Sequence, residues 1–297
     1  MVNILVPVTL IEMMIAIGLG VMIKDILAVA RDWRLLLRAA AANYVLVPLA
    51  TVGLLLLFRA NPMVSAGFLI LAACPGAPYG PPATAIARGN VAAAVGLMVL
   101  LAGSSAILAP LVLGMVMPLV AGNVQLTMSA GKMVTTLLVT QLLPLSIGVG
   151  VRHFYPYSAR LQKPAQRLST VLNLILICLV VGAQYRMLLE IRFRGLFGML
   201  SLLLATLAIG WLLGSRNIES RKTMMLTTAL RNVGVGLVIA NGAFAGTPAL
   251  TAVLAYGLIE VAGSLLVAFC SRSATGSNET RRSVVRNNAA LSDERLS

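Results

Sequence analysis

The chain has 297 residues, of which 59% are hydrophobic and only 11% are charged, against about 25% charged in a typical soluble domain. This composition excludes a soluble enzyme, a disordered chain and a disulfide-rich scaffold. The net charge of +14 comes from lysines and arginines in short segments between apolar runs, a pattern typical of membrane proteins rather than of nucleic-acid-binding surfaces.

Nine apolar stretches are long enough to cross a bilayer core, which takes about 20 apolar residues in a helix. In chain order they are residues 3–23, 39–58, 63–87, 91–118, 132–151, 168–186, 195–214, 222–243 and 248–270. The first lacks a basic flank and a cleavage pattern, so we interpret it as a retained helix rather than a signal peptide. Residues 271–297 are rich in Ser, Asn and Arg, and we expect a disordered tail there. The sequence predicts an all-α polytopic membrane protein with a single transmembrane domain over residues 1–270.

The distribution of basic residues predicts the orientation of these spans. The loops on one side, together with the tail, carry 17 lysines and arginines, whereas the loops on the other side carry 5. Because cytoplasmic loops are enriched in basic residues, the tail is predicted to be cytoplasmic. With nine crossings, the N-terminus is then predicted to lie outside.

Two of the nine spans are interrupted near their middle. The third contains Cys74–Pro82 (CPGAPYGPP), with four prolines and two glycines in nine residues, and the eighth contains Ala229–Gly236 (ALRNVGVG). Proline removes an amide donor and clashes with the preceding turn, so the third span cannot be a continuous helix. Because the two breaks lie five spans apart, their helices cross in opposite directions, which indicates an inverted repeat with a binding site near the membrane midplane.

Glu12, Arg231 and Glu260 are the ionisable residues nearest the middle of their spans, and such residues are costly unless paired or hydrated. Two compatible interpretations stay open. Arg231 could form a structural ion pair with Glu260 or Glu12, or it could face an anionic substrate or substitute for a bound cation. A carboxyl group shielded from water favours its neutral form, so Glu260 or Glu12 could also carry a proton.

The candidate site residues lie in the two breaks or are polar residues of neighbouring spans. The candidate substrate- or ion-binding residues are Asn43, Pro75, Gly76, Pro78, Tyr79, Gly80, Thr84, Thr227, Arg231, Asn232, Gly234, Glu260 and Glu12. The single histidine lies in a basic loop and the three cysteines lack metal-ligand spacing, so we expect no catalytic set, no cofactor and no metal site of His and Cys residues. The pairs Gly210/Gly214 and Gly242/Gly246 are typical of close helix packing.

Five stretches resemble those of a known family. They are GLGVMIKD (18–25), NYVLVPL (43–49), CPGAPYGPPATAIARGN (74–90), LAPL (108–111) and LRNVGVGL (230–237). From about residue 12 to residue 270 the chain resembles the bile acid:sodium symporter family. The resemblance implies two inverted repeats with two crossing discontinuous helices and the family's first helix absent. It also implies a panel-like group at 3–23, 132–151 and 168–186, a core group at 39–118 and 195–270, and a place in a bacterial inner membrane.

The chain departs from the family pattern at positions of the family's sodium sites. Where the family has Ser-Asn after the Cys-Pro-Gly turn, this chain has Gly80 and Pro81. Thr227 aligns with the glutamate shared by the family's two sodium sites, and Arg231 and Asn43 align with glutamines. Since a hard cation needs several oxygen ligands, the sequence predicts degenerate sodium sites.

These observations predict a secondary transporter that moves a small organic anion, bile-acid-like or another carboxylate, by alternating access. The expected partners are this anion and the lipid bilayer, with no nucleic acid. Coupling is expected to be proton-linked or absent rather than sodium-driven. The alternative is a sensor or receptor of the same fold that no longer transports. No ATP-binding G-x-x-x-x-G-K-[ST] motif and no HExxH motif occurs, so neither an ATP-driven pump nor an enzyme is expected.

Overall fold

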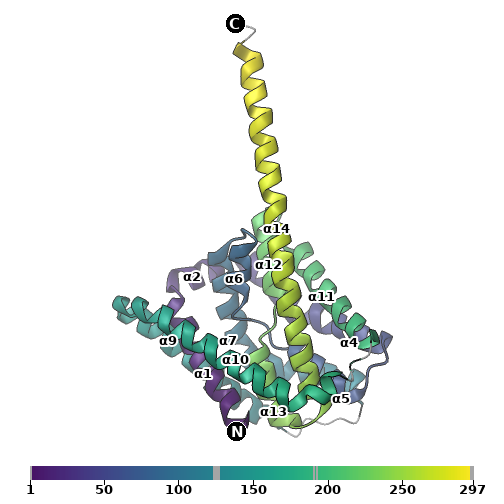
Figure 1. Ribbon diagram of the computed structural model, residues 1–297. Coiled ribbons are helices and arrows are strands. Elements are labelled where there is room, and N and C mark those ends of the chain that lie inside the picture. The colour runs from purple at the N-terminus through teal and green to yellow at the C-terminus, as the bar shows by residue number, and fades with distance from the viewer. Residues whose placement is uncertain (1, 123–127, 190, 192, 295–297) are drawn as a thin grey trace.

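The computed structural model describes residues 2–122, 128–189, 191 and 193–294, and within these ranges all regular structure is helical (Figure 1). Arg192 is one of the five basic residues on the side predicted to be outside, and it lies outside the described ranges, as do the last three residues of the tail. The elements are α1 (Val2–Gly20), α2 (Ile23–Arg31), α3 (Trp33–Ala41), η1 (Ala42–Leu46), α4 (Val47–Leu57), α5 (Pro62–Ala72), α6 (Gly80–Ile86), α7 (Val91–Val120), α8 (Ala130–Leu137), η2 (Leu138–Leu142), α9 (Leu143–Phe154), η3 (Pro156–Ser158), α10 (Ala159–Leu189), α11 (Phe193–Leu213), α12 (Ile218–Ala229), α13 (Val233–Phe244) and α14 (Pro248–Glu294).

The helices confirm the predicted class, a polytopic all-helical membrane protein. Within the described residues, seven helical stretches are long and apolar enough to cross a membrane, and the bent pair α1–α2 makes an eighth. The third predicted span is divided into α5 and α6, neither of which is long enough to cross by itself. If this interrupted pair is also counted as one span, the total equals the nine crossings that the sequence predicts, and the nine-span count stays a prediction.

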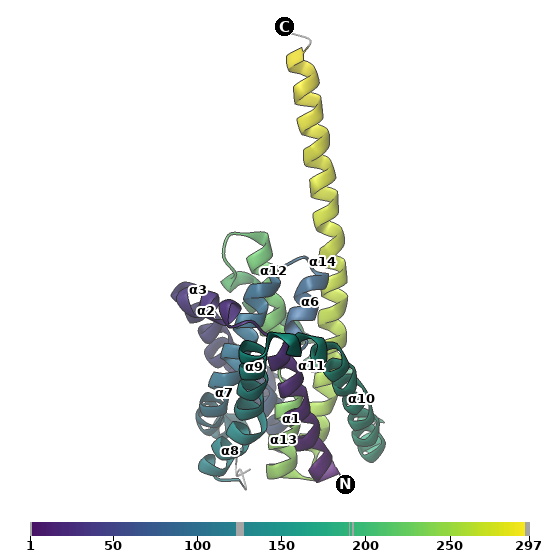
Figure 2. The same cartoon turned by 90° about the vertical axis from the view of Figure 1, so that its left-hand side faces the viewer.

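The first predicted span ends earlier than expected, because α1 stops at Gly20 and the chain bends by 85° into α2. Met22 is extended at the bend, with φ −99° and ψ 133°. The Asp32 carboxylate then caps α3 by accepting a hydrogen bond of 3.0 Å from the Leu35 N–H. Helices α2 and α3 lie at the end of the molecule opposite the N-terminus (Figure 2), the end predicted to be cytoplasmic.

Helix α1 packs mainly against α9 and α10, and we call α1, α8, η2, α9 and α10 the panel. Two glycines allow α1 and α9 to approach closely. A Cβ atom on Gly18 would lie 2.6 Å from the Leu145 carbonyl oxygen, and one on Gly148 would meet the backbone of Ile15. Helix α1 is enclosed between α9 and α10 as a result (Figure 2).

The helices from α3 to α7 and from α11 to α14 pack together, and we call them the core. Gly210 and Gly214 lie against α12, where added Cβ atoms would come within 2.5 Å of Met224 and Arg221, so close packing is confirmed for this pair. The same prediction for Gly242 and Gly246 is wrong, because the close neighbour of Gly242 is the side chain of Met128, which lies outside the helices. Gly246 is the turn residue between α13 and α14, with φ 72°, and nothing lies within 4 Å of its Cβ position.

Helix α14 continues to Glu294, whereas the sequence predicted a disordered tail from residue 271. Its C-terminal half projects away from the other helices (Figure 1). The segment contains no proline after Pro248, so nothing in its covalent structure ends the helix that begins in the membrane span.

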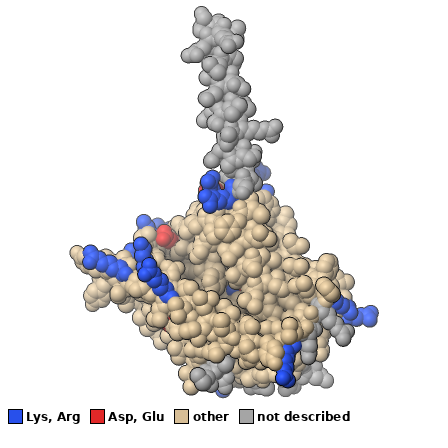
Figure 3. All heavy atoms as spheres, in the orientation of Figure 1, with Lys and Arg blue, Asp and Glu red and all other residues tan. Residues whose placement is uncertain are grey.

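The surface of the helical body is consistent with a bilayer environment. Figure 3 shows a face on which charged side chains are sparse and most of the area is uncharged. Large apolar side chains are exposed on lipid-accessible helices, for example Leu57, Met115 and Leu204, which are 71%, 72% and 64% exposed. In a soluble monomer such a surface would be a large apolar patch, whereas in a membrane it faces lipid.

Candidate functional site: the crossing of two broken helices

The two interrupted spans meet at the centre of the core. The non-helical segment 73–79 separates α5 from α6, and segment 230–232 separates α12 from α13; we call the two segments together the crossing. The Asn232 N–H donates a hydrogen bond of 2.8 Å to the Cys74 carbonyl, and the Asn232 side-chain amide reaches the Gly76 carbonyl at 3.4 Å. The prediction that the two breaks approach each other is therefore confirmed.

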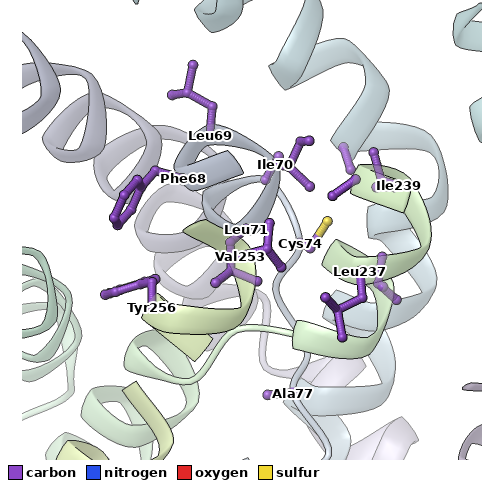
Figure 4. Close-up of a cluster of buried hydrophobic side chains, with 14 of the residues drawn as sticks. Phe68, Leu69, Ile70, Leu71, Cys74, Ala77, Leu237, Ile239, Val253 and Tyr256 are labelled. Atoms are coloured by element: carbon purple, nitrogen blue, oxygen red, sulfur yellow. The ribbon is translucent and has the colours of Figure 1, made fainter. Parts of the chain in front are cut away.

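Gly76 and Asn232 hold the backbone of the crossing. Gly76 has φ 86°, and a Cβ atom there would lie 2.7 Å from the Ala102 Cα of α7, so both its conformation and its space require glycine. The Asn232 side chain caps α13 by accepting a hydrogen bond of 3.2 Å from the Val235 N–H. A buried apolar cluster from α5, α13 and α14, including Leu71, Leu237 and Tyr256, surrounds these segments (Figure 4).

Arg231 fills the crossing, and all five N–H groups of its guanidinium have an oxygen partner. Nε donates to the Leu71 carbonyl at 3.3 Å. Nη1 donates to the Asn43 side-chain oxygen at 2.6 Å and to the Thr228 carbonyl at 3.3 Å. Nη2 donates to the Asn43 carbonyl at 3.4 Å and to the Ala72 carbonyl. With a side chain that is only 1% exposed, Arg231 is a buried cation enclosed by oxygens.

The partners of Arg231 are groups that a buried helix end leaves unsatisfied. Leu71, Ala72 and Thr228 belong to the last turns of α5 and α12, whose carbonyls have no partner within the helix and carry partial negative charge. The Leu71 carbonyl also accepts the Cys74 N–H at 3.0 Å. Asn43 lies in η1, the short π-helical segment before α4, where its backbone is also off the regular α-helical pattern. The guanidinium thus offsets the partial negative charge of the oxygens from three segments that converge at the crossing.

Glu260 on α14 meets Arg231 in a different way from the predicted ion pair. One carboxylate oxygen accepts the Arg231 backbone N–H at 2.8 Å, while the guanidinium points toward carbonyl oxygens. The other oxygen, Oε2, is buried and has no hydrogen-bond partner among the described residues, and the same holds for the Tyr256 and Ser264 hydroxyls on the same face of α14. Glu260 is thus the carboxyl group nearest to the crossing.

Other predicted site residues lie around the crossing. Gly80, at the start of α6, faces Thr227, whose methyl group would be 3.6 Å from a Cβ atom on that glycine. The Thr84 hydroxyl bonds back to the Gly80 carbonyl at 2.8 Å within α6, and Pro75 and Pro78 lie in segment 73–79. Gly234 faces the panel, because a Cβ atom there would lie 3.2 Å from the Leu10 side chain of α1.

Two predicted residues lie at the contact surface of the panel rather than among the oxygens around Arg231. Tyr79, 36% exposed, extends from the crossing and accepts a hydrogen bond of 2.7 Å from the Asn173 side chain of α10. Glu12 on α1 accepts a hydrogen bond of 2.6 Å from the Ser169 hydroxyl of α10, so it bonds within the panel and not to Arg231.

Sequence reasoning missed two residues of this region. Asn173 is an amide in a predicted span, the same signal that singled out Asn43. Lys222, the first residue of the eighth predicted span, is 4% exposed. Its ammonium group donates to the Ala87 carbonyl at the end of α6 and to the Ser271 carbonyl of α14. No local pattern identifies Lys222, because its partners are 135 and 49 residues away.

The sequence was also compared with known families and proteins. The sequence model of the sodium bile acid symporter family matches residues 7–191, more than half of the chain. The chain belongs to this family. The match runs from α1 to just beyond α10, so it includes the first broken helix of this symporter-family fold and not the second. No curated protein matches the sequence.

Within this family fold, the positions that departed from the sodium pattern are neighbours in space. Gly80 faces Thr227, and Arg231 bonds to Asn43. At the second pair a guanidinium, with five donors and no acceptor, stands where our alignment placed a glutamine. Arg231 thus places a fixed positive charge beside Asn43, whose side-chain and backbone oxygens both accept hydrogen bonds from it.

Proposed function

We propose that this protein is a secondary transporter of a small organic anion in a bacterial inner membrane, and that it works without sodium. Membership of a symporter family supports the transport function. Two interrupted helices cross in the core, and the panel, a separate set of helices, packs next to this crossing. This arrangement supports alternating access in which the panel moves against the core.

The observation that carries the sodium independence is the saturation of Arg231. In this proposal the guanidinium supplies permanently the positive charge that a bound sodium ion would bring, because five oxygens surround it as they would surround a hard cation. Since its side chain is 1% exposed, we infer that Arg231 acts by holding the crossing together and not by contacting the anion directly.

The region where the anion would bind is the boundary between the crossing and the panel. Tyr79 and Gly234 both face this boundary from the core side, and Asn173 and Leu10 face it from the panel side. Glu260 is the first candidate for a proton carrier and Glu12 the second, since both are carboxyl groups within predicted spans. A carboxyl group that exchanged its proton during the cycle would make uptake respond to a pH gradient.

The direct test is uptake by proteoliposomes that contain the purified protein, using a bile acid such as taurocholate and a panel of smaller carboxylates. A Leu10→Cys/Gly234→Cys variant, in a background with Cys74, Cys178 and Cys270 replaced by Ala, joins panel to core. We expect uptake of at least one anion, its arrest when the two thiols are cross-linked, and its return after reduction. The single-cysteine variants are the controls.

Two outcomes would contradict the proposal. Uptake that continues through a fully cross-linked protein would exclude movement of the panel against the core. Binding of an anion without any flux, in both gradient directions, would favour the alternative of a sensor that keeps the fold.

A further inference from the structure

A cavity of about 450 Å³ lies away from the crossing, at the end of the molecule where α4 ends and α11 begins. Its walls come from α4, α5, α11 and α14, and Met187 of α10 and Ile191 close one side. This volume is within the range of cavities that bind small molecules. The basic-residue distribution places this end on the outer side of the membrane.

The inside of this outer cavity is apolar. Leu54 and Leu55 of α4, Phe68 of α5, and Met199 and Leu202 of α11 line it. The two threonine side chains in the wall are already engaged within the protein: the Thr51 hydroxyl donates to the Val47 carbonyl at 2.8 Å, and the Thr251 hydroxyl donates to the Gln184 side chain at 3.0 Å. An apolar chain fits these walls better than a sugar or a nucleotide does.

Two arginines stand at the edge of this apolar space. Arg59 and Arg194 both line the outer cavity and both are exposed, and neither guanidinium has a hydrogen-bond partner among the described residues. The sequence assigns only five basic residues to this side of the membrane, so the convergence of two of them on one cavity is a marked concentration of positive charge.

The backbone at Arg59 adds an independent observation. Arg59 follows the end of α4 with φ 47°, and its N–H bonds to the Leu56 carbonyl at 3.1 Å while the Ala60 N–H bonds to the Leu55 carbonyl at 3.0 Å. This is the Schellman motif, in which glycine normally occupies the left-handed position. A residue with a Cβ atom is strained there, and such strain clusters at functional sites. Here the strained residue carries a guanidinium at the rim of the cavity.

We propose that the outer cavity binds an anionic amphiphile, with its acyl chain among the apolar side chains and its carboxylate or phosphate head group held by Arg59 and Arg194. Arginine suits this role because its planar fork bonds to carboxylate and phosphate with two parallel hydrogen bonds. Two sources share this chemistry, a free long-chain carboxylate and an anionic phospholipid of the surrounding bilayer. The site is separate from the crossing, so it stands or falls independently of the transport proposal.

The test measures binding by the full-length protein in nanodiscs of zwitterionic phosphatidylcholine, as displacement of a fluorescent fatty-acid analogue. Dodecanoate, dodecanol and dodecyltrimethylammonium present the same chain with a negative, neutral and positive head. We expect dodecanoate to bind tightest and each of Arg59→Gln and Arg194→Gln to weaken it by about tenfold, through loss of charge-assisted hydrogen bonds. Gly198→Leu, which adds bulk to the cavity wall beside Phe58, should abolish binding.

The control is Lys132→Gln, which removes a positive charge from the same predicted side but outside the cavity lining, and it should leave dodecanoate binding unchanged. Equal binding of the three head groups, or full binding by the Arg59→Gln/Arg194→Gln double variant, would overturn the proposal. Competition by phosphatidylglycerol placed in the nanodisc would support it with a lipid as the occupant. Dodecanoate binding that phosphatidylglycerol does not reduce would support it with a free carboxylate as the occupant.

Discussion

Arg231 determines the chemistry of the crossing because a single side chain satisfies oxygens from three segments. A guanidinium is planar and stays protonated, so it can serve five acceptors at fixed directions, whereas an ammonium group has three donors. In this protein all five donors of the Arg231 guanidinium bond to an oxygen. Lysine would keep the charge, but its three donors could not serve all five oxygens.

Replacing Arg231 should therefore destabilise the fold in a graded way. In Arg231→Met the carbonyls of Ala72 and Thr228 and the side-chain oxygen of Asn43 lose their donor. We expect a loss of at least about 3 kcal/mol, since each unsatisfied buried acceptor costs about 1–3 kcal/mol. Arg231→Lys should lose less. Thermal unfolding in detergent measures both. Arg216→Gln, which changes an exposed arginine, should unfold like the wild type, and an Arg231→Met protein as stable as the wild type would show that the oxygens do not need the cation.

Tyr79 and Asn173 form a polar contact between the crossing and the panel, 2.7 Å between the hydroxyl oxygen and the amide nitrogen. We expect Tyr79→Phe and Asn173→Ala each to change the half-saturating anion concentration by a few fold, as loss of one hydrogen bond of about 0.5–1.5 kcal/mol implies. Because the two side chains share one contact, the double variant should be no worse than either single variant. Tyr157→Phe, at an 82% exposed tyrosine, is the control. Additive effects would mean that the contact is not shared during transport.

At the scale of elements, the breaks in the two helices depend on backbone as much as on side chains. Gly76→Ala should prevent the first broken helix from docking on α7, because it places a Cβ atom 2.7 Å from the Ala102 Cα at a residue with φ 86°. We expect a lower yield of folded protein in size-exclusion chromatography. Gly53→Ala, in α4 with open space around its Cβ position, should be neutral or stabilising. Equal behaviour of the two variants would contradict the requirement for glycine at the crossing.

The sequence predicts elements here better than it predicts contacts. Segment 73–79 is recognisable because proline and glycine exclude a helix locally, and the span lengths follow from apolar composition alone. Three hydrogen-bond partners of Arg231, in Asn43, Leu71 and Ala72, are 188, 160 and 159 residues away in the chain. The sequence around Arg231 therefore does not predict whether its guanidinium contacts a carboxylate, a substrate or a carbonyl group. For the tail, the polar composition predicted disorder, whereas α14 continues as a helix to Glu294.

At the scale of the whole molecule, the distribution of basic residues and the number of spans predict which end of the molecule faces the cytoplasm. We expect the N-terminus outside and the end of α14 in the cytoplasm, because the side that carries the tail holds 17 basic residues against 5. A cytoplasm-active reporter fused after residue 297 should be active, and a periplasm-active reporter fused there should be silent. The opposite pattern would overturn both the nine-span count and the placement of the outer cavity.

Fixed positive charge lies in different settings in the core and at the end of the molecule that is predicted to be outside. Arg231 is enclosed by oxygens in the core, and Arg59 and Arg194 are exposed at the outer end. A charge that is part of the chain is present in every step of the transport cycle, whereas a sodium ion binds and leaves. In our proposal, a core built around Arg231 carries out transport without a sodium gradient, and a proton gradient or the anion's own gradient drives it.

Uptake of the anion by proteoliposomes, with all sodium replaced by potassium or choline, tests this account most directly. We expect the same initial rate in sodium-free and sodium-containing buffers for the wild-type protein. We expect sodium-stimulated uptake only in the variant Asn43→Gln/Thr227→Glu/Arg231→Gln, which restores the oxygen-bearing side chains that the family resemblance implies. Wild-type uptake that strictly requires sodium would contradict the proposal that Arg231 takes the place of the coupling cation.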